Sequence, residues 1–465
     1  MDSPNPADPD GSRATLTRFR RGFALTAALL LLFVGLFGFL NFQQGPKLSS
    51  AQVDLTGVVS QSGQQLRLFA NQAVAKVEAD QLTVTPAAAA SVSTSGDVIA
   101  VQFDEPLRYA TDYTVEIAGV TSQYIEQPTT FSYTFTTNAP PLYYLDRGEE
   151  TDQVIRTGIN TTDRTIVYSA PKIQDYAVFD AAVAVIAEDD TGNSTLVLVN
   201  EAGNVEDIAL PGEGTIDLVR ANSVTGYLGF SFTSTGPTPD REFASTLFTM
   251  DLNSGRLLTP VTGIDGAPVS ALEWLFVPLT SQLVVQNTSQ SVFAVDTATD
   301  GATVPVGQFN ELNSVSTDGR TLVLTDPFGP IAFSLADRTS VRLDPSPLEG
   351  VAPFGGTAEV LPGGDWVQQV AIFDEATGRF RNIVVVDDGD ASRVLFRTVN
   401  DEGSIVSFAV SPNNQYVAIE MVPNIAGSSP DGYTTNGRAT EITTVFVDIS
   451  TGAVVKSVEG FRVSW

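Results

Sequence analysis

A short pattern that recurs through the C-terminal part of the chain constrains the fold more than any other feature. Two or three apolar residues are followed by Asp or a substitute and then by a turn that contains Gly, as in Val445 to Asp448 with Gly452. The pattern occurs seven times, with its Asp position at Asp146, Asn200, Asp251, Asp296, Ser334, Asp374 and Asp448. Successive positions are 54, 51, 45, 38, 40 and 74 residues apart, and four-stranded propeller blades recur at roughly 40 to 50 residues. The period predicts a β-propeller in which each recurrence marks the third strand of a blade.

The length of the repeat region favours seven blades. Residues 141–465 provide about 46 residues per blade for seven blades and about 54 for six, and the smaller value is nearer the usual repeat. The last residues, 460–465, have the pattern of a first strand. We therefore expect the C-terminal strand to complete the blade that residues 142–146 begin, which would remove two open sheet edges. The second strand of that shared blade has no assignment in the sequence.

Two further segments, 314–324 and 408–419, each have the pattern of a strand, a tight turn and a strand. Asp318-Gly319 and Asn413-Asn414 supply the turns. These segments resemble the first two strands of blades in WD-repeat-like and TolB-like propellers. The resemblance implies a propeller that makes protein contacts in the cell envelope. Related propellers accompany peptidase domains, but no hydrolase domain pattern follows here, so only the binding role is implied.

Residues 22–42 predict a single transmembrane helix. They contain no formally charged residue, and a spanning helix needs about 20 apolar residues. Four Arg precede the segment and only Lys47 follows it closely, so the positive-inside rule places residues 1–21 in the cytoplasm as a short disordered tail. We predict a retained signal anchor in the cell membrane, with all later domains extracytoplasmic. A cleaved signal peptide is the alternative, although its apolar run is usually shorter.

Residues 51–137 predict a small β-sandwich. Short alternating runs separated by turns are expected as strands at 65–70, 82–85, 98–103, 113–117 and 131–136. The order of these runs resembles a bacterial immunoglobulin-like domain of the type repeated in surface-layer and cell-surface proteins. The resemblance implies a spacer. The predicted fold class is thus all-β, with an immunoglobulin-like sandwich and a seven-bladed propeller behind one N-terminal transmembrane helix.

The composition excludes several kinds of function. The chain has no Cys and no His, which removes thiol chemistry, disulfides and any Ser-His-Asp triad. With 25 basic and 54 acidic residues, its formal charge of −29 disfavours nucleic acid as a partner. Acidic runs such as 188–190 and 387–390 lack EF-hand spacing and read as hairpin turns, so Ca²⁺ is the one cofactor left open. No catalytic or metal-ligating residue is predicted.

Aromatic residues are the candidate binding residues. Trp274, Trp366 and Trp465 fall in or beside predicted strands, where an aromatic ring could line a sugar-binding surface or fill a blade interface. Tyr433 lies in a polar insertion, 424–441, that accounts for the 74-residue gap in the repeat. Long loops on a scaffold often carry function, although a tolerated insertion would look the same.

The sequence supports three hypotheses. The first is a membrane-anchored binding scaffold whose propeller presents a face to an envelope protein or a cell-wall polymer. The second is a carboxylate-dependent glycan hydrolase or lyase, because paired carboxylates need not be adjacent in sequence. The third is a passive structural component of the envelope. A propeller can serve any of them, and the absence of a catalytic motif favours the first.

Overall fold

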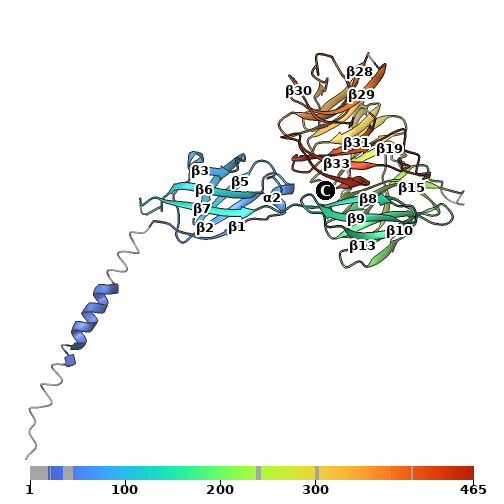
Figure 1. The fold of residues 1–465 in the computed structure, drawn as a ribbon. Coiled ribbons are helices and arrows are strands. Elements are labelled where there is room, and N and C mark those ends of the chain that lie inside the picture. The colour runs from blue at the N-terminus through green and yellow to red at the C-terminus, as the bar shows by residue number, and fades with distance from the viewer. Residues whose placement is uncertain are drawn as a thin grey trace, which may run out of the picture. The chain divides into compact units, whose positions relative to one another are not determined.

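The computed structural model describes residues 19–20, 22–34, 45–124, 126–236, 242–298, 303–375, 377–399 and 402–465. The chain after residue 45 is built almost entirely of antiparallel strands, which confirms the all-β prediction. It forms two compact units, one containing strands β1–β7 and the other β8–β35 (Figure 1).

The predicted membrane segment is only partly described. Residues 22–34 are helical and mostly exposed. Within the described ranges, no helix combines the length and apolar character needed to cross a bilayer. Residues 35–42 of the predicted segment, and residues 1–18 and 21 of the predicted tail, lie outside the described residues.

The N-terminal unit consists of two small sheets. One has the order β1 (Leu48–Gln52), β2 (Gln65–Ala70), β5 (Val98–Phe103) and β4 (Ala90–Ser95); the other has β3 (Leu82–Thr85), β6 (Asp112–Val120) and β7 (Thr129–Thr136). A four-residue helix, α2 (Gly57–Ser60), and a 3-10 turn, η1 (Ala79–Gln81), lie between strands. In β5 every second residue is buried, as the alternating sequence predicts for a half-buried strand. The sheets meet at Phe103 and Phe135, whose ring centroids are 6.3 Å apart.

The second unit contains seven four-stranded antiparallel sheets, here called blades. Blades 1 to 3 are β11 (Ile173–Val178), β12 (Ala182–Glu188), β13 (Ser194–Asn200), β14 (Val205–Ile208); β15 (Gly214–Asn222), β16 (Tyr227–Ser234), β17 (Thr246–Asp251), β18 (Leu258–Pro260); and β19 (Ala271–Phe276), β20 (Gln282–Asn287), β21 (Ser291–Asp296), β22 (Val304–Gln308). Blades 4 to 6 are β23 (Glu311–Val315), β24 (Thr321–Asp326), β25 (Gly329–Ser334), β26 (Ser340–Arg342); β27 (Phe354–Val360), β28 (Trp366–Asp374), β29 (Arg379–Asp387), β30 (Ser392–Arg397); and β31 (Ser404–Val410), β32 (Tyr416–Val422), β33 (Thr443–Asp448), β34 (Val454–Glu459).

Blade 7 joins the two ends of the repeat region. Its order is β35 (Phe461–Ser464), β8 (Pro141–Arg147), β9 (Asp152–Gly158) and β10 (Thr165–Ala170). β35 pairs with β8 through Phe461 opposite Leu145 and Ser464 opposite Tyr143, and Figure 1 marks the C-terminus beside β8. The blade has four strands. Residues 142–146 were expected in a third strand, but they lie in β8, which is the second strand of this blade. β8 is therefore the second strand for which the sequence offered no assignment.

The apolar content of the strands follows their place in a blade. In β32 all seven residues are buried, because neighbouring blades cover both faces of the sheet. The fourth strands are more polar and more exposed, as in β14 and β34. The first strands of neighbouring blades contact one another, for example β11 with β15 and β19 with β23. These contacts and the shared blade 7 define a seven-bladed β-propeller.

Every first strand carries a break in its register with the second strand. The breaks fall between Ile173 and Asp175 in β11, Ile216 and Val219 in β15, Ala271 and Glu273 in β19, Leu312 and Ser314 in β23, Gly355 and Ala358 in β27, Ile405 and Ser407 in β31, and Phe461 and Ser464 in β35. A β-bulge redirects the side chains beside it. Side chains beside some of these breaks contact the next first strand: Arg220 in β15 pairs with Glu273 in β19, and the Ser314 hydroxyl in β23 donates to the carbonyl of Ala358 in β27.

Candidate functional site

The polar insertion between β32 and β33 folds into a small hairpin. The backbone N–H of Asp431 donates to the carbonyl of Arg438 at 2.9 Å, and Thr440 N–H donates to the carbonyl of Ser429 at 2.8 Å. An isolated bridge joins Pro430 and Ala439. The insertion therefore has an ordered structure of its own and accounts for part of the 74-residue gap. The rest of the gap arises because Asp374 ends a second strand, β28, whereas Asp448 ends a third strand, β33.

A buried ion pair fastens this hairpin to blade 7. Arg147, at the end of β8, lies 2.5 Å from the Asp431 carboxylate, and their side chains are 6% and 9% exposed. The same guanidinium donates to the carbonyl of Asn436 at 3.0 Å and lies 3.7 Å from the centroid of the Tyr433 ring. Burying two charges is favourable only when further hydrogen bonds satisfy them. Here the carbonyls of Ile173 and Gln174 accept as well, at 3.2 and 3.0 Å.

Tyr433 provides a second attachment. Its hydroxyl donates to the carboxylate of Asp152, which is 1% exposed and also accepts from the N–H of Ile173 at 2.7 Å. Burial raises the pKa of Asp152, and the hydrogen bonds only partly oppose this effect. Burial, and then the bond to Asp152, raises the pKa of Tyr433 well above its usual value. The proton therefore stays on Tyr433 at neutral pH.

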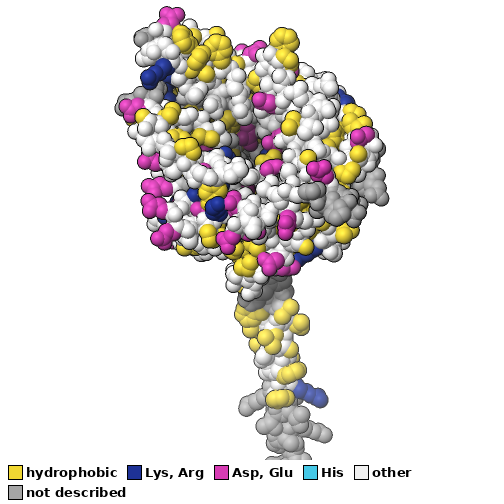
Figure 2. Space-filling model, turned by 90° about the vertical axis from the view of Figure 1, so that its right-hand side faces the viewer, with side chains coloured by type: hydrophobic (Ala, Val, Ile, Leu, Met, Phe, Trp, Pro, Cys, Tyr) yellow, Lys and Arg dark blue, Asp and Glu magenta, His cyan; other side chains and the backbone are white. Residues whose placement is uncertain are grey.

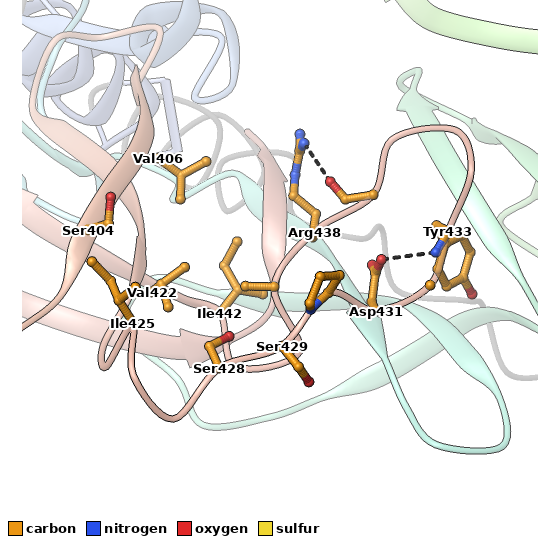
Figure 3. Close-up of a pocket in the computed structure, with 14 residues that line it drawn as sticks. Ser404, Val406, Val422, Ile425, Ser428, Ser429, Asp431, Tyr433, Arg438 and Ile442 are labelled. Atoms are coloured by element: carbon orange, nitrogen blue, oxygen red, sulfur yellow. Dashed lines mark hydrogen bonds between the residues drawn. The ribbon is translucent and has the colours of Figure 1, made fainter.

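The hairpin and blade 6 enclose a groove of about 740 Å³ (Figure 3). Pockets of about 300–1,000 Å³ commonly hold small ligands or short segments. The lining comes from β31, β32 and the hairpin: Ser404, Val406, Val422, Ile425, Ser428, Ser429, Pro430, Asp431, Gly432, Tyr433, Gly437, Arg438, Ala439 and Ile442. The side chains of Val406 and Ile425 are 42% and 57% exposed, so the groove presents apolar surface to solvent. We call it the insertion groove.

Two polar groups in the insertion groove lack protein partners. Among the described residues, the Nε of Arg438 and the hydroxyl of Ser428 are buried and accept or donate no hydrogen bond. Arg438 makes no ion pair within the described ranges; it donates weakly to the carbonyl of Gly437, at 3.4 Å, and lies 5.5 Å from the Phe461 ring centroid. Buried polar groups usually find a hydrogen-bond partner. The described residues include six more without one, among them the Nε of Arg220 and of Arg381, so the two in the groove matter for their place beside its apolar lining.

A second polar cluster lies on the innermost strands. The guanidinium of Arg462 in β35 contacts both carboxylate oxygens of Asp175 in β11, at 2.8 and 3.0 Å. The backbone N–H of Arg462 donates to the Glu420 carboxylate at 2.5 Å. A cavity of about 260 Å³ lies beside it, lined by β11, β15, β19 and β35. Figure 2 shows a hollow in one face of the propeller with acidic side chains around it. The cluster ties blades 6, 7 and 1 together, which is a structural role.

The four candidate aromatic residues have different surroundings. Trp274 is fully buried between blades 2 and 3, and Trp366 is 7% exposed, with its Nε1 donating to Gln368 at 3.0 Å. Trp465 stacks on Tyr416, with centroids 6.3 Å apart, and packs edge-on against Phe446. Tyr433 alone lines the insertion groove. The structure thus brings none of the three Trp to that groove.

The acidic runs are occupied by turn hydrogen bonds. Asp189 accepts from the N–H groups of Thr191 and Asn193, and Asp388 from those of Asp390 and Ala391. Hydrogen bonds from Thr191, Asn193 and Gly192 lower the pKa of Asp189. Over the ranges that the structure describes, no group of three acidic residues is placed to hold a metal ion.

The described residues form a closed seven-bladed propeller, and the insertion between β32 and β33 builds a groove on it. No protein-family model and no curated protein sequence matches the chain. Similar solved structures include TolB from Acinetobacter baumannii, at 10% identity, with 82% of this chain and 81% of that one covered and a TM-score of 0.37. They also include the β-propeller domain of the Trilobed protease from Pyrococcus furiosus, at 12% identity, 71% and 89% coverage and a TM-score of 0.40.

A third similar structure is AztD from Citrobacter koseri, at 15% identity, with 69% of this chain and 81% of that one covered and a TM-score of 0.37. At such identities and TM-scores these likenesses carry nothing about what this chain binds. The propeller assignment rests on the strand order and on the closure of blade 7.

Proposed function

We propose that the protein is a membrane-anchored binding scaffold of the cell envelope, with the insertion groove as its binding site. The observation that carries the proposal is the groove itself. It opens on a propeller whose strands fix its walls, and it combines exposed apolar side chains with unpaired polar groups. Binding sites characteristically combine an apolar lining with a few polar groups.

The rest of the chain fits this role. In the proposal, residues 22–42 span the membrane once, with the N-terminus in the cytoplasm and both β units outside. The two-sheet N-terminal unit is an immunoglobulin-like spacer, since its seven strands form two sheets that meet at aromatic side chains. It would hold the propeller away from the bilayer, where a partner in the envelope could reach the groove.

Binding explains the polar groups better than hydrolysis does. A glycan hydrolase needs two carboxyl groups that reach the substrate. Beside the groove, Asp152 is 1% exposed beneath Tyr433, and Asp431 is paired with Arg147. Both carboxylates hold the hairpin in place. We therefore favour a scaffold over the hydrolase or lyase, and we infer that the groove serves recognition.

The proposal is tested by chemical crosslinking in intact cells. The full chain is compared with a chain ending at residue 140, which keeps the predicted anchor and the N-terminal unit but lacks the propeller. We expect discrete crosslinked products that disappear with the propeller. Products that persist without it would overturn the role of the propeller. Crosslinks only between copies of this chain would favour a passive structural component.

A further inference from the structure

We infer that the insertion groove binds an extended protein segment that carries a large apolar side chain and a nearby carboxylate. The inference rests on the proposed binding function and names the chemistry of the partner. It follows from the arrangement of chemical groups in the groove, where Figure 3 shows Ser428 and Arg438 on either side of the apolar Ile442.

The apolar floor selects a protein partner over a sugar or phosphate polymer. Val406 and Ile425 are substantially exposed at 42% and 57%, while Val422 and Ile442, which also line the groove, are 9% exposed. Apolar surface of this kind gains free energy only when another apolar group covers it. Glycans and phosphate polymers present mainly polar groups, whereas a peptide can supply a Leu or Phe side chain.

The guanidinium of Arg438 selects a carboxylate. Its Nε is buried without a partner, and no acidic side chain within the described residues pairs with it. The acidic side chain in the groove lining, Asp431, is already paired with Arg147. A carboxylate accepts several hydrogen bonds and matches the planar donors of Arg, so it suits the Arg438 guanidinium, which lines the groove and has no acidic partner among the described residues.

The position of Ser428 indicates that the partner is extended. Its buried hydroxyl also lacks a protein partner among the described residues. Figure 3 shows Ser428 and Arg438 on opposite sides of Ile442, so a bound segment must cross the apolar floor to reach both. Rotation of the Ser428 side chain would let its hydroxyl donate to a backbone carbonyl at one end, and a carboxylate at the other end can accept from the Arg438 guanidinium.

The net charge of −29 does not oppose this arrangement. Charges in solution are screened over about 8 Å at physiological salt, so distant acidic residues contribute little inside the groove. The Arg438 guanidinium, which makes no ion pair within the described residues and lines the groove, is much closer to a bound segment. Its contact, and not the total charge, therefore sets the local preference for an acidic group.

The test measures binding of short fluorescent peptides to the full chain in detergent micelles. Each peptide carries one Leu or Phe and one Asp or Glu, and a matched set carries Asn or Gln in place of the acid. We expect the acidic set to bind more tightly. Arg438→Gln should weaken acidic peptides roughly tenfold or more, because a hydrogen bond to a charged group is lost, and should leave the amide set unchanged.

Matched variants separate the groove from general effects. Ile425→Ser should weaken both peptide sets, since it removes exposed floor. Two control variants should leave the binding of both peptide sets unchanged. Arg379→Gln replaces an exposed Arg that does not line the groove, and Leu257→Ser replaces a Leu that is 75% exposed in the turn between β17 and β18. Unchanged thermal unfolding midpoints show that the variants remain folded.

Several results would overturn the inference. One is that Arg438→Gln weakens the acidic and the amide peptides equally, and another is that no peptide binds above background. A third is that inorganic polyphosphate displaces the peptides in an Arg438-dependent way while peptides without Leu or Phe bind as tightly as those with it. The proposed function is judged separately by the cell crosslinking experiment. If the propeller-dependent products persist unchanged in cells that carry Arg438→Gln, the scaffold stands and this groove is not its site.

Discussion

We predict that the ion pair between Arg462 and Asp175 strongly stabilises the closed propeller. Arg462 lies in the last strand, and both of its contacts to the Asp175 oxygens, at 2.8 and 3.0 Å, link β35 to blade 1. The side chain of Asp175 is 5% exposed and that of Arg462 is 32% exposed. Removing one partner of a buried pair costs about 3–5 kcal/mol, and the partial exposure of Arg462 places this pair near 3 kcal/mol.

The perturbation is Arg462→Met, which keeps the length of the side chain and leaves the Asp175 carboxylate without its cation. Asp175→Asn retains an oxygen for the N–H of Tyr176, which now donates to it at 2.8 Å. The double variant removes both charges, so it should unfold at a higher urea concentration than Arg462→Met alone. The expected coupling energy is about 1–3 kcal/mol.

Tryptophan fluorescence during urea unfolding is a selective assay, because all three Trp of the chain, at 274, 366 and 465, lie in the propeller. The reasoning is refuted if Arg462→Met costs less than about 1 kcal/mol, or if the double variant loses the sum of the two single losses. Either result would mean that backbone pairing of β35 with β8 closes the ring without help from this ion pair.

Three other substitutions should each change stability or local exchange through one side chain. Burial raises the pKa of Glu359 from 4.5 to about 7, so ionisation of this carboxyl opposes folding: its contribution to stability should be full below pH 4.5, fall between pH 4.5 and 7, and level off above 7. Glu359→Gln should remove that fall in urea titrations, a gain of at most about 3 kcal/mol at high pH. Gly229→Ala should cost about 1–3 kcal/mol in the same assay, because a Cβ would lie 2.7 Å from the Trp274 ring. Asp431→Asn should speed hydrogen exchange in residues 424–441, since the buried Arg147 loses its counter-charge, and unchanged exchange there would contradict the ion pair as the anchor.

The repeat could be predicted because blade strands are local in sequence. Five of the seven recurrences do mark third strands, but Asp146 and Asp374 end second strands, β8 and β28. The hairpin after Asp374 has the same apolar run, Asp and Gly as a hairpin between third and fourth strands. A local turn pattern cannot count strands, so blades 5 and 7 were misaligned by one strand within a correct total.

In the N-terminal unit, the runs expected at 65–70, 82–85 and 98–103 coincide with β2, β3 and β5. The sequence missed β1 and β4, whose residues are mostly Ser, Ala, Thr and Gln. These edge strands are held by backbone pairing with β2 and β5 and bury little apolar surface. Periodicity therefore gave no signal for them.

The insertion was recognisable from its length and polarity, but its attachments were not. Tyr433 and its partner Asp152 are 281 residues apart, and Arg147 and Asp431 are 284 apart. Only the closure of the ring brings blade 7 beside blade 6. Arg438 carried no sequence signal of its own, because its significance comes from the absence of a partner in the folded groove.

The central claim is that a partner occupies the insertion groove, and photocrosslinking in intact cells tests it most directly. A photoreactive residue replaces Ile425 in the groove or, as the control, Leu257 in a β17–β18 turn. The account predicts a discrete crosslinked partner from position 425 and none from position 257. The same products from both positions, or none from 425, would contradict it.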